Sequence, residues 1–160
     1  MSGLPAGIEI TAARSPSQDV RDLVGELERL LAGLYTPEQQ HGLRLDDLFQ
    51  PHIRFFVASL DGMAAGCGGV ALCEDYAEVK RMYARTVARG RGVARALLER
   101  IEAEARDVGL AVLRLETGVH SHDALRFYER AGFRRRGPFG PYASMAAPAI
   151  ATSLFYEKTL

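Results

Sequence analysis

The sequence predicts a mixed β-sheet with helices on both of its faces. Two observations carry this prediction: a hairpin signal at Asp61-Gly62, and strand-like runs that alternate with two strongly periodic helices in the second half of the chain. The 160 residues, about half of them apolar, show no internal repeat and no linker. We therefore expect one domain, residues 1–160, that buries about two thirds of its unfolded surface.

The chain begins with a strand and a long amphipathic helix. Ile8, Ile10 and Ala12 alternate with their neighbours at the period of a half-buried strand. Ser15-Pro16-Ser17-Gln18 is typical of a capping box with proline at the first helical position. The helix that follows has an apolar stripe of Val20, Leu23, Val24, Leu27, Leu30, Leu31 and Leu34.

A polar connection and a hairpin come next. Residues 36–50 predict a shorter helix or a turn-rich connection. Asp61-Gly62 then joins two strands, 53–60 and 63–72, because this dipeptide favours a two-residue hairpin turn. Cys67 lies in the second of these strands and Cys73 beside it, and we interpret both as small buried hydrophobic residues.

A fourth strand is expected over 76–84. Strict alternation would place Glu78, Lys80 and Met82 on one face, and Val79, Arg81 and Tyr83 on the other.

The second half of the chain then alternates between helix and strand. A helix begins near Val93, with Arg95, Glu99, Glu102 and Arg106 on its wet face. A strand over 112–117, a helix over 120–131 that ends at Gly132, and a last strand over 153–158 follow. Arg134-Arg135-Arg136 is the solvated end of a strand, and the alanine-rich loop 143–151 borders a cleft.

Composition excludes several classes of protein. The formal net charge is zero, which argues against nonspecific nucleic-acid binding. Residues 1–20 have no apolar leader segment and no run of 18 apolar residues occurs, so we expect a cytoplasmic protein without a membrane span. No metal-ligand cluster accompanies the cysteines, and we expect no metal. Residues 1–80 carry 6 basic and 12 acidic side chains, whereas residues 81–160 carry 14 and 8.

The basic half contains a glycine loop between the fourth strand and the next helix, Arg89-Gly90-Arg91-Gly92-Val93-Ala94. The first N–H groups of a helix lack intrahelical partners and attract anions, and glycine lets the backbone approach a phosphate closely. A tight turn before a helix also uses glycine for conformational reasons, so the loop alone leaves both interpretations open.

The spacing Arg89-x-x-Gly92-x-Ala94 resembles the coenzyme A pyrophosphate motif of the GNAT superfamily of acyl-CoA-dependent N-acyltransferases. The segment 124–133, which ends in Gly132-Phe133, is similar to the last helix of that superfamily and its exit. The motifs 115–118 (Leu-Glu-Thr-Gly) and 138–142 (Pro-Phe-Gly-Pro-Tyr) look like a bacterial subgroup of these proteins.

This resemblance implies a GNAT-like α/β (α+β) fold over about residues 8–160. Its central sheet would be mixed, mostly antiparallel, with six to seven strands and about four flanking helices. It implies acetyl-CoA (coenzyme A) as co-substrate and direct transfer of the acyl group to a primary amine in a ternary complex. The acceptor would be a small-molecule or peptide amine, and a homodimer is compatible with the fold. The implied cofactor-binding residues are Met82, Tyr83, Ala84, Arg89, Gly90, Arg91, Gly92, Val93 and Ala94.

The resemblance also implies two catalytic residues. Glu78 precedes Arg89 by eleven residues, the spacing of a glutamate general base in one branch of the superfamily. Tyr128 occupies the position of the residue that meets the departing thiolate. Direct proton transfer from an ammonium to an ordinary glutamate is uphill by about 8 kcal/mol, so burial, a water or a neutral substrate must assist.

Other interpretations stay open. Glu78 could be a solvent-facing carboxylate paired with Lys80, and Tyr128 a core residue. His120 and His122 stand where many relatives have an asparagine. A noncatalytic acyl-CoA-binding or sensing module, and an interaction scaffold without a ligand, are therefore competing hypotheses.

Overall fold

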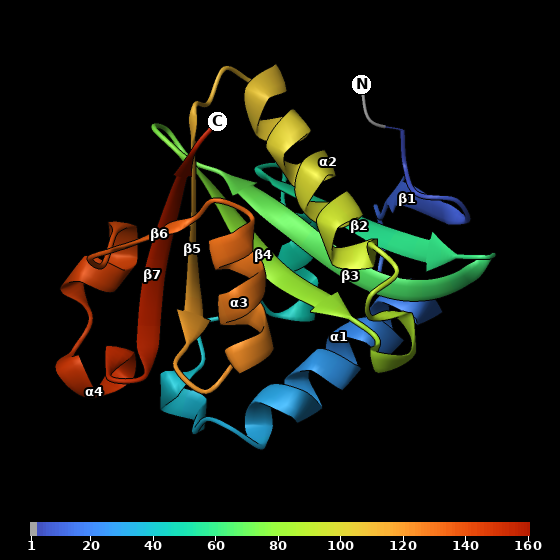
Figure 1. The fold of residues 1–160 in the computed structure, drawn as a ribbon. Helices are drawn as coiled ribbons and strands as arrows, with labels where there is room; N and C mark the ends of the chain where they lie inside the picture. Colours follow the sequence, from blue (N-terminus) through green and yellow to red (C-terminus); the bar gives the residue numbers. More distant parts are fainter. Residues whose placement is uncertain (1–2) are drawn as a thin grey trace.

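The computed structural model describes residues 3–160, which form a seven-stranded sheet flanked by four α-helices (Figure 1). The strands are β1 (Ile8–Ala12), β2 (Ile53–Leu60), β3 (Met63–Leu72), β4 (Ala77–Ala84), β5 (Val112–Gly118), β6 (Arg134–Arg136) and β7 (Ser153–Thr159). The α-helices are α1 (Gln18–Ala32), α2 (Val93–Asp107), α3 (His122–Arg130) and α4 (Ala147–Ile150). Short 3-10 helices are η1 (Pro37–Gln39), η2 (Leu45–Phe49), η3 (Thr86–Ala88) and η4 (Gly140–Ser144).

The strand order is β1-β2-β3-β4-β5-β7-β6, and every neighbouring pair is antiparallel except β4 and β5. The predicted mixed, mostly antiparallel sheet is confirmed. No helix within residues 3–160 combines the length and the apolar character that a bilayer crossing requires.

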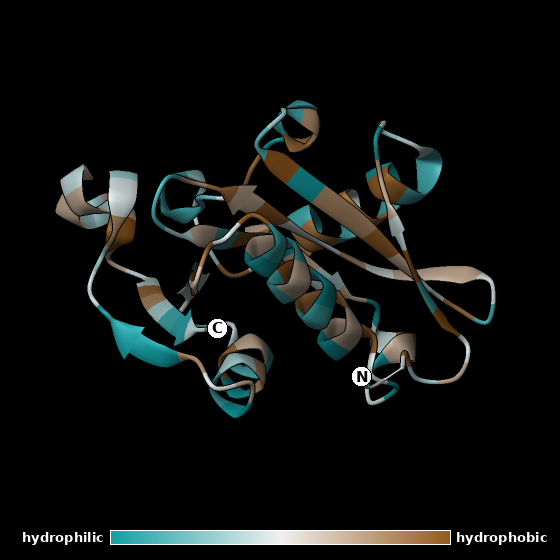
Figure 2. Cartoon of the chain, turned by 90° about the horizontal axis from the view of Figure 1, so that it is seen from above, coloured by the Kyte–Doolittle hydropathy of each residue, from teal (hydrophilic) through white to brown (hydrophobic). Residues whose placement is uncertain are grey.

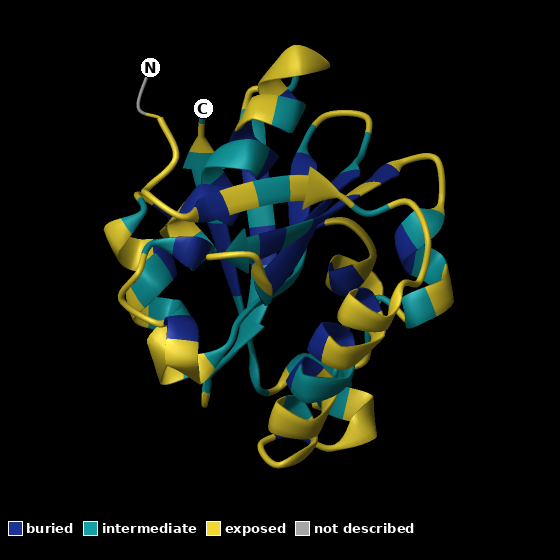
Figure 3. Cartoon of the chain, turned by 90° about the vertical axis from the view of Figure 1, so that its right-hand side faces the viewer, coloured by how far each residue is buried: buried dark blue, intermediate teal, exposed yellow. Residues whose placement is uncertain are grey.

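Each face of the sheet carries its own apolar core. Adjacent residues of a strand point to opposite faces, and the neighbours Phe55 and Phe56 accordingly belong to different clusters. The cluster with Phe56 packs under α2 and α3, and the one with Phe55 packs under α1 and η2. Figure 3 shows the buried residues gathered on the central strands and the exposed ones on the helices and loops around them.

The helix α1 begins later than the capping-box interpretation predicts. Its N-cap is Ser17, whose side chain accepts a hydrogen bond from the Val20 N–H (3.3 Å), and Pro16 therefore precedes the helix. Ser15 and Ser17 are both suitable caps, and the sequence does not distinguish them. The connection over 36–50 holds η1 and η2, so it is the turn-rich alternative that the structure adopts.

The hairpin at Asp61-Gly62 is confirmed, with φ values of 51° and 86° that suit a two-residue turn. The segment Arg134-Arg135-Arg136, predicted to be the solvated end of a strand, is the edge strand β6, which pairs with β7. Figure 2 shows it as a hydrophilic stretch. Charged side chains on an edge strand discourage pairing with another chain.

The prediction that Glu102 lies on the wet face of α2 is wrong. Its carboxylate is buried and accepts a hydrogen bond from Lys158 Nζ of β7 (2.6 Å). Helical periodicity assigns a face from the helix alone, whereas here the last strand covers that face. The ion pair joins the end of the chain to α2.

A β-bulge interrupts β4 at Arg81, which has a φ of 55°. Opposite it, the register of β3 shifts between Cys67 and Gly69. The Cys67 thiol donates to the Arg81 carbonyl (3.4 Å), and burial raises the pKa of this thiol to about 12, so it stays protonated. Because an extra residue reverses the alternation, Met82 packs with Val79 under α2. The predicted shared face of Met82 with Glu78 and Lys80 is therefore wrong.

The strands β4 and β5 begin side by side and then diverge (Figure 1). Their register contains two pairs, Ala77 with Leu113 and Glu78 with Arg114. Beyond Glu78 this edge of β4 pairs with no strand among the described residues. A cleft lies at this opening in the sheet.

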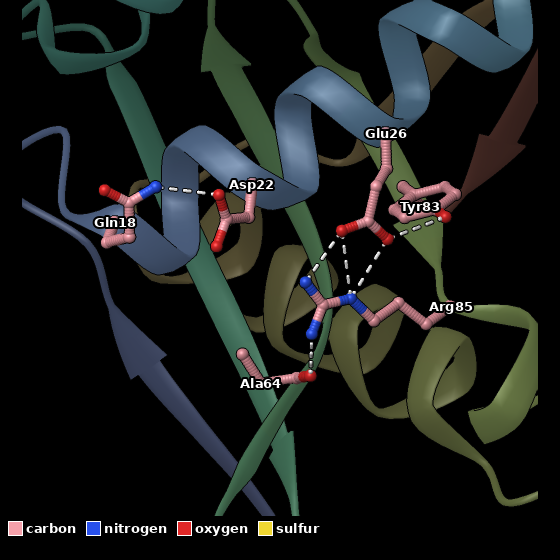
Figure 4. Close-up of polar contacts among 6 residues, drawn as sticks. All are labelled: Gln18, Asp22, Glu26, Ala64, Tyr83 and Arg85. Atoms are coloured by element: carbon pink, nitrogen blue, oxygen red, sulfur yellow. Dashed lines mark hydrogen bonds and ion pairs between the residues drawn. The ribbon is translucent and has the colours of Figure 1, made fainter.

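One ion pair anchors α1 to the end of β4 (Figure 4). The Arg85 guanidinium donates to both carboxylate oxygens of Glu26, with distances of 3.0 Å from Nε and 2.7 Å from Nη2. Its Nη1 donates to the Ala64 carbonyl (2.8 Å), and the Tyr83 hydroxyl donates to Glu26 (3.2 Å). Bidentate geometry of this kind is the stronger form of ion pair.

We expect Glu26→Gln to lower the free energy of unfolding by about 1–2 kcal/mol at pH 7. The hydrogen bond from Arg85 holds the pKa of Glu26 below its usual value. Its stabilising contribution is therefore complete above the pKa of an unfolded glutamate, about 4.3, and is lost as the pH falls through the lower folded value. Urea denaturation at pH 7 and at pH 3 measures this loss.

Asp22→Asn is the matched control, because Asp22 lies one turn earlier on α1 and its carboxylate accepts one exposed hydrogen bond, from Gln18 (2.8 Å). It should change the unfolding free energy by less than about 0.5 kcal/mol. An equal loss in both variants would mean that the bidentate geometry contributes nothing.

Candidate active site

A cleft of about 840 Å³ occupies the opening between β4 and β5. It extends from the N-terminus of α2 to the segment of η1 and η4, and α1 and α3 form parts of its walls. The cleft passes from one face of the sheet to the other, because α3 lies on the face of α2 whereas Glu78 and Tyr142 lie on the face of α1 and η4. Two ligands can therefore enter it from different sides.

The glycine loop forms one end of the cleft. The first helical hydrogen bond of α2 runs from the Ala96 N–H to the Gly92 carbonyl (3.0 Å), so the amides of Val93, Ala94 and Arg95 precede it. Gly92 is the N-cap and has a φ of 90°, a left-handed conformation that favours glycine. A Cβ added at Gly90 would meet no atom within 4 Å, so this loop leaves room beside its backbone.

The two arginines of the loop point in different directions. The Arg89 guanidinium lines the cleft and pairs with Asp123 at the start of α3 (2.6 Å). The Arg91 guanidinium lies 3.9 Å from Asp61 of the β2–β3 hairpin, and Arg91 is absent from the cleft lining. The backbone of the loop and the Arg89 side chain thus border this end of the cleft, whereas Arg91 does not line it.

The free edge of β4 supplies further N–H groups. The Arg85 N–H donates to the Ala65 carbonyl of β3 (2.8 Å), and Tyr83 pairs with Cys67 in the same ladder. Amides of successive residues point to opposite sides of a strand, so those of Met82 and Ala84 point toward the opening. Of the three residues expected here, Tyr83 directs its amide to β3 instead.

Glu78 lies where β4 and β5 part, and its side chain is in a buried hydrogen-bonded group. It is 6% exposed and accepts a hydrogen bond from the Tyr142 hydroxyl (2.7 Å). Lys80 Nζ lies 2.9 Å from the same carboxylate oxygen and 3.1 Å from the Tyr142 hydroxyl. Burial, and then the charge of Glu78, raise the pKa of Tyr142, so this hydroxyl stays protonated. Glu78 is therefore paired with Lys80, but in the cleft rather than at the surface.

Tyr128 reaches the cleft from α3. Its ring packs against Phe127 and Phe133, with centroids 5.3 and 5.5 Å away. Burial raises the pKa of its hydroxyl, and the Glu116 charge raises it further. Tyr128 is thus both a core residue and a protonated hydroxyl at the cleft wall.

Sequence reasoning assigned no role to Glu116 or Tyr142, although both lie in motifs that it singled out. The Glu116 side chain lines the cleft beyond Glu78 and accepts a hydrogen bond from Ser153 of β7 (2.7 Å). Glu116 and Ser153 meet because β5 pairs with β7, a pairing that the sequence does not show.

The C-terminal half of α1 forms an apolar wall of the cleft. Its predicted stripe is buried at Val20, Leu23, Val24 and Leu27. It then emerges into the cleft, where Leu30 and Leu34 are 48% and 41% exposed. The first half of the predicted stripe is therefore core, and the second half faces the cleft.

Contacts between distant segments hold together the end of the cleft that lies away from the glycine loop. His41 Nε2 donates to the Ala149 carbonyl (2.7 Å), joining the end of η1 to α4. The Tyr35 hydroxyl accepts from the His120 N–H (3.0 Å) and bonds to Ser121 Oγ (2.9 Å). His122, the first residue of α3, also lines the cleft. The expectation for the loop 143–151 is wrong: none of its residues lines the cleft, although Tyr142 of η4 does and Ala149 contacts the lining residue His41.

These features fit a coenzyme A thioester. The amides of α2 suit a diphosphate, the free edge of β4 suits an extended amide-bearing chain, and the apolar lining suits its carbon atoms. The cradle would hold the phosphates through residues 89–95, and the edge of β4 would meet the chain at Met82 and Ala84.

Comparison with known proteins identifies acetyltransferases as relatives of this chain. The model of the acetyltransferase (GNAT) family matches residues 22–133. The IAA acetyltransferase of Azospirillum brasilense is 48% identical over 155 residues, which cover 94% of this chain and 98% of that protein.

Two solved structures have the same fold. A candidate acyl-CoA N-acyltransferase from Klebsiella pneumoniae is 31% identical, with a TM-score of 0.78 over 96% of this chain and 97% of the other. The PaiA N-acetyltransferase from Thermoplasma acidophilum, solved with coenzyme A, is 16% identical and shares the fold, with a TM-score of 0.69 over 95% and 99% of the two chains.

Proposed function

Because the chain belongs to the GNAT acetyltransferase family and is therefore an acyltransferase, we propose that it transfers the acetyl group of acetyl-CoA to a primary amine. The observation that carries this proposal is the single cleft that joins the amides of α2, the free edge of β4 and the Glu78 group. The co-substrate supplies a thioester, which an amine can attack directly when both are bound.

The residues on the cofactor side of the cleft bind acetyl-CoA and polarise its thioester carbonyl. The amides of residues 92–95, with Arg89, hold the diphosphate. The amide of Met82 or Ala84 donates to the thioester carbonyl, where negative charge develops during attack. A backbone donor placed at such an oxygen contributes about 3 kcal/mol to the rate in comparable sites.

Glu78 accepts the proton that the amine loses. Its engaged oxygen lies 2.7 Å from the Tyr142 hydroxyl, and the other oxygen is available for a water that contacts the amine. As the nitrogen–carbon bond forms, the proton passes through this water to Glu78. The water bridges the distance between the two groups. The nitrogen becomes more acidic than a free ammonium as the bond to carbon forms, which makes the transfer to a carboxylate less unfavourable.

Tyr128 stabilises the leaving thiolate. When the carbon–sulfur bond breaks, the charge on sulfur needs a donor, and the buried Tyr128 hydroxyl is protonated. A phenol whose pKa is raised is a poor acid toward a thiolate, so hydrogen bonding precedes full proton transfer.

Amine-dependent release of the coenzyme A thiol from acetyl-CoA tests the proposal. We expect release with at least one member of a panel of alkyl, aryl, amino-acid and peptide amines, together with coenzyme A binding by calorimetry. Binding without release across the whole panel would favour a noncatalytic acyl-CoA-binding module. Absence of both would favour a scaffold without a ligand.

A further inference from the structure

Glu116 has a different environment from the other charged groups near the β4–β5 opening. Its carboxylate accepts a hydrogen bond from Ser153 Oγ (2.7 Å), and no ion pair forms to it among residues 3–160. Burial raises the pKa of Glu116, while the hydrogen bond from Ser153 and the nearby His41 and Lys80 act in the opposite direction. A charged carboxylate in such a place is stabilised by any cation that enters the cleft.

The neighbouring charges are already paired. Lys80 pairs with Glu78 (2.9 Å), and the Arg81 guanidinium donates to the Leu43 carbonyl (2.7 Å) and lies 3.6 Å from Glu28. When it is ionised, Glu116 thus offers one negative charge that no side chain among residues 3–160 neutralises by an ion pair. A ligand with a single positive charge meets this requirement, whereas a second one would have no partner here.

Carbon surface lies on the same face of the sheet. Leu30 and Leu31 of α1, and Leu34 just beyond it, line the cleft, and Leu30 and Leu34 are half-exposed. Glu116 pairs in register with Phe155, which packs with Tyr142 on that face. Leucines exposed to a cavity favour an apolar ligand, because contact with it removes their surface from water.

We propose that the acceptor is a monocationic amine with an apolar body, whose ammonium group binds Glu116 and whose body lies on Leu30, Leu31 and Leu34. This inference rests on the proposed function and names the acceptor class for the same cleft. Glu116 binds and orients the ammonium group. The ammonium loses one proton to solvent before attack, and Glu78 takes the second proton as the nitrogen–carbon bond forms.

Calorimetry on the protein saturated with coenzyme A tests the inference without turnover. The probes are n-hexylamine, 1,6-diaminohexane and 1-hexanol, which share a six-carbon chain and differ in charge. We expect n-hexylamine to bind at least tenfold more tightly than either of the others. In Glu116→Gln, which retains an acceptor for Ser153, its affinity should fall about 10- to 100-fold, whereas that of 1-hexanol should not change.

The apolar wall is tested by the double variant Leu30→Asn and Leu34→Asn, with Leu4→Asn as the control. Leu4 is 49% exposed and lies outside the cleft lining. We expect the double variant to bind n-hexylamine about tenfold less tightly, the effect of losing apolar contact for about two methylene groups. The control should bind it as the wild type does.

The outcomes separate this inference from the proposed function. Equal binding of n-hexylamine by wild type and Glu116→Gln, or equal binding of the amine and the diamine, would overturn the inference, whatever the turnover. If n-hexylamine binds as expected but neither it nor any amine of the panel is acetylated, the proposed function fails, and Glu116 binds an ammonium ligand that is not an acetyl acceptor. When turnover occurs, Glu116→Gln should raise KM about 10- to 100-fold and change kcat less than about threefold.

Discussion

Replacing Gly92 with glutamate is expected to abolish coenzyme A binding at concentrations that saturate the wild-type protein. The substitution places a carboxylate beside the amides that would hold the diphosphate, and like charges in contact cost several kcal/mol. We expect at least a 100-fold loss of affinity. Calorimetry measures it directly, and thermal unfolding gives a second measure because a ligand at about 100 times its Kd stabilises by about 2.7 kcal/mol.

Backbone strain is a separate effect of this substitution, because Gly92 has a φ of 90°. Gly109→Glu is the control for this strain, because Gly109 lies just beyond α2 and has a φ of 82°. A Cβ at Gly92 would also lie 3.2 Å from Pro5 Cγ, whereas one at Gly109 would meet no atom within 4 Å. Gly109→Glu should therefore cost less stability than Gly92→Glu and retain coenzyme A binding. Ala94→Glu adds the same charge at a helical position without strain and should lose binding as Gly92→Glu does. Retained binding in Ala94→Glu would contradict the position of the anion site.

The second large effect is expected for Glu78→Gln. If Glu78 takes the proton of the amine, its loss should lower kcat about 100-fold or more, the usual contribution of a general base. Coenzyme A binding should not change, because Glu78 lies beyond the cradle. Steady-state kinetics with an amine that the wild type acetylates, on protein whose coenzyme A stoichiometry has been measured, gives kcat per folded molecule.

Glu99→Gln is the control for this experiment, since Glu99 pairs with Arg95 on the exposed side of α2. Tyr128→Phe keeps the packed ring and removes the hydroxyl. It should lower kcat about tenfold, the value of one hydrogen bond to a charged atom. Wild-type kcat in Glu78→Gln would assign its carboxylate to the structural pairing with Lys80. The Glu78→Gln stability should then fall, because Lys80 loses its partner.

Local patterns in the sequence were sufficient for most elements of the fold. The turn at Asp61-Gly62 is specified by two adjacent residues, and the stripes of α1 and α2 follow from helical periodicity. Each of these signals lies within a few residues of the element that it predicts. For the same reason the boundaries, such as the start of α1 at Ser17 rather than Ser15, depend on which of two equivalent caps finds its N–H.

The features that sequence patterns missed depend on contacts between distant segments. The bulge at Arg81 places a non-glycine residue at positive φ, and no local signal announces it. Glu102 is buried because β7 supplies Lys158 from 56 residues away. Tyr142 reaches Glu78 across 64 residues. The glycine loop could thus be named from its local pattern, and Glu78 and Tyr128 through the resemblance, whereas the neighbours of Glu78, Tyr142 and Glu116, could not be predicted.

The two pairs that join β4 to β5 have a mechanical consequence. The sheet has its fewest register pairs at this seam, so we expect slow bending of the described molecule to be easier there than within either half. The walls that face each other across the seam belong to different halves, one ending at residue 84 and the other starting at residue 112. A small rotation of one half of the sheet relative to the other, near Glu78, would therefore change the width of the whole cleft.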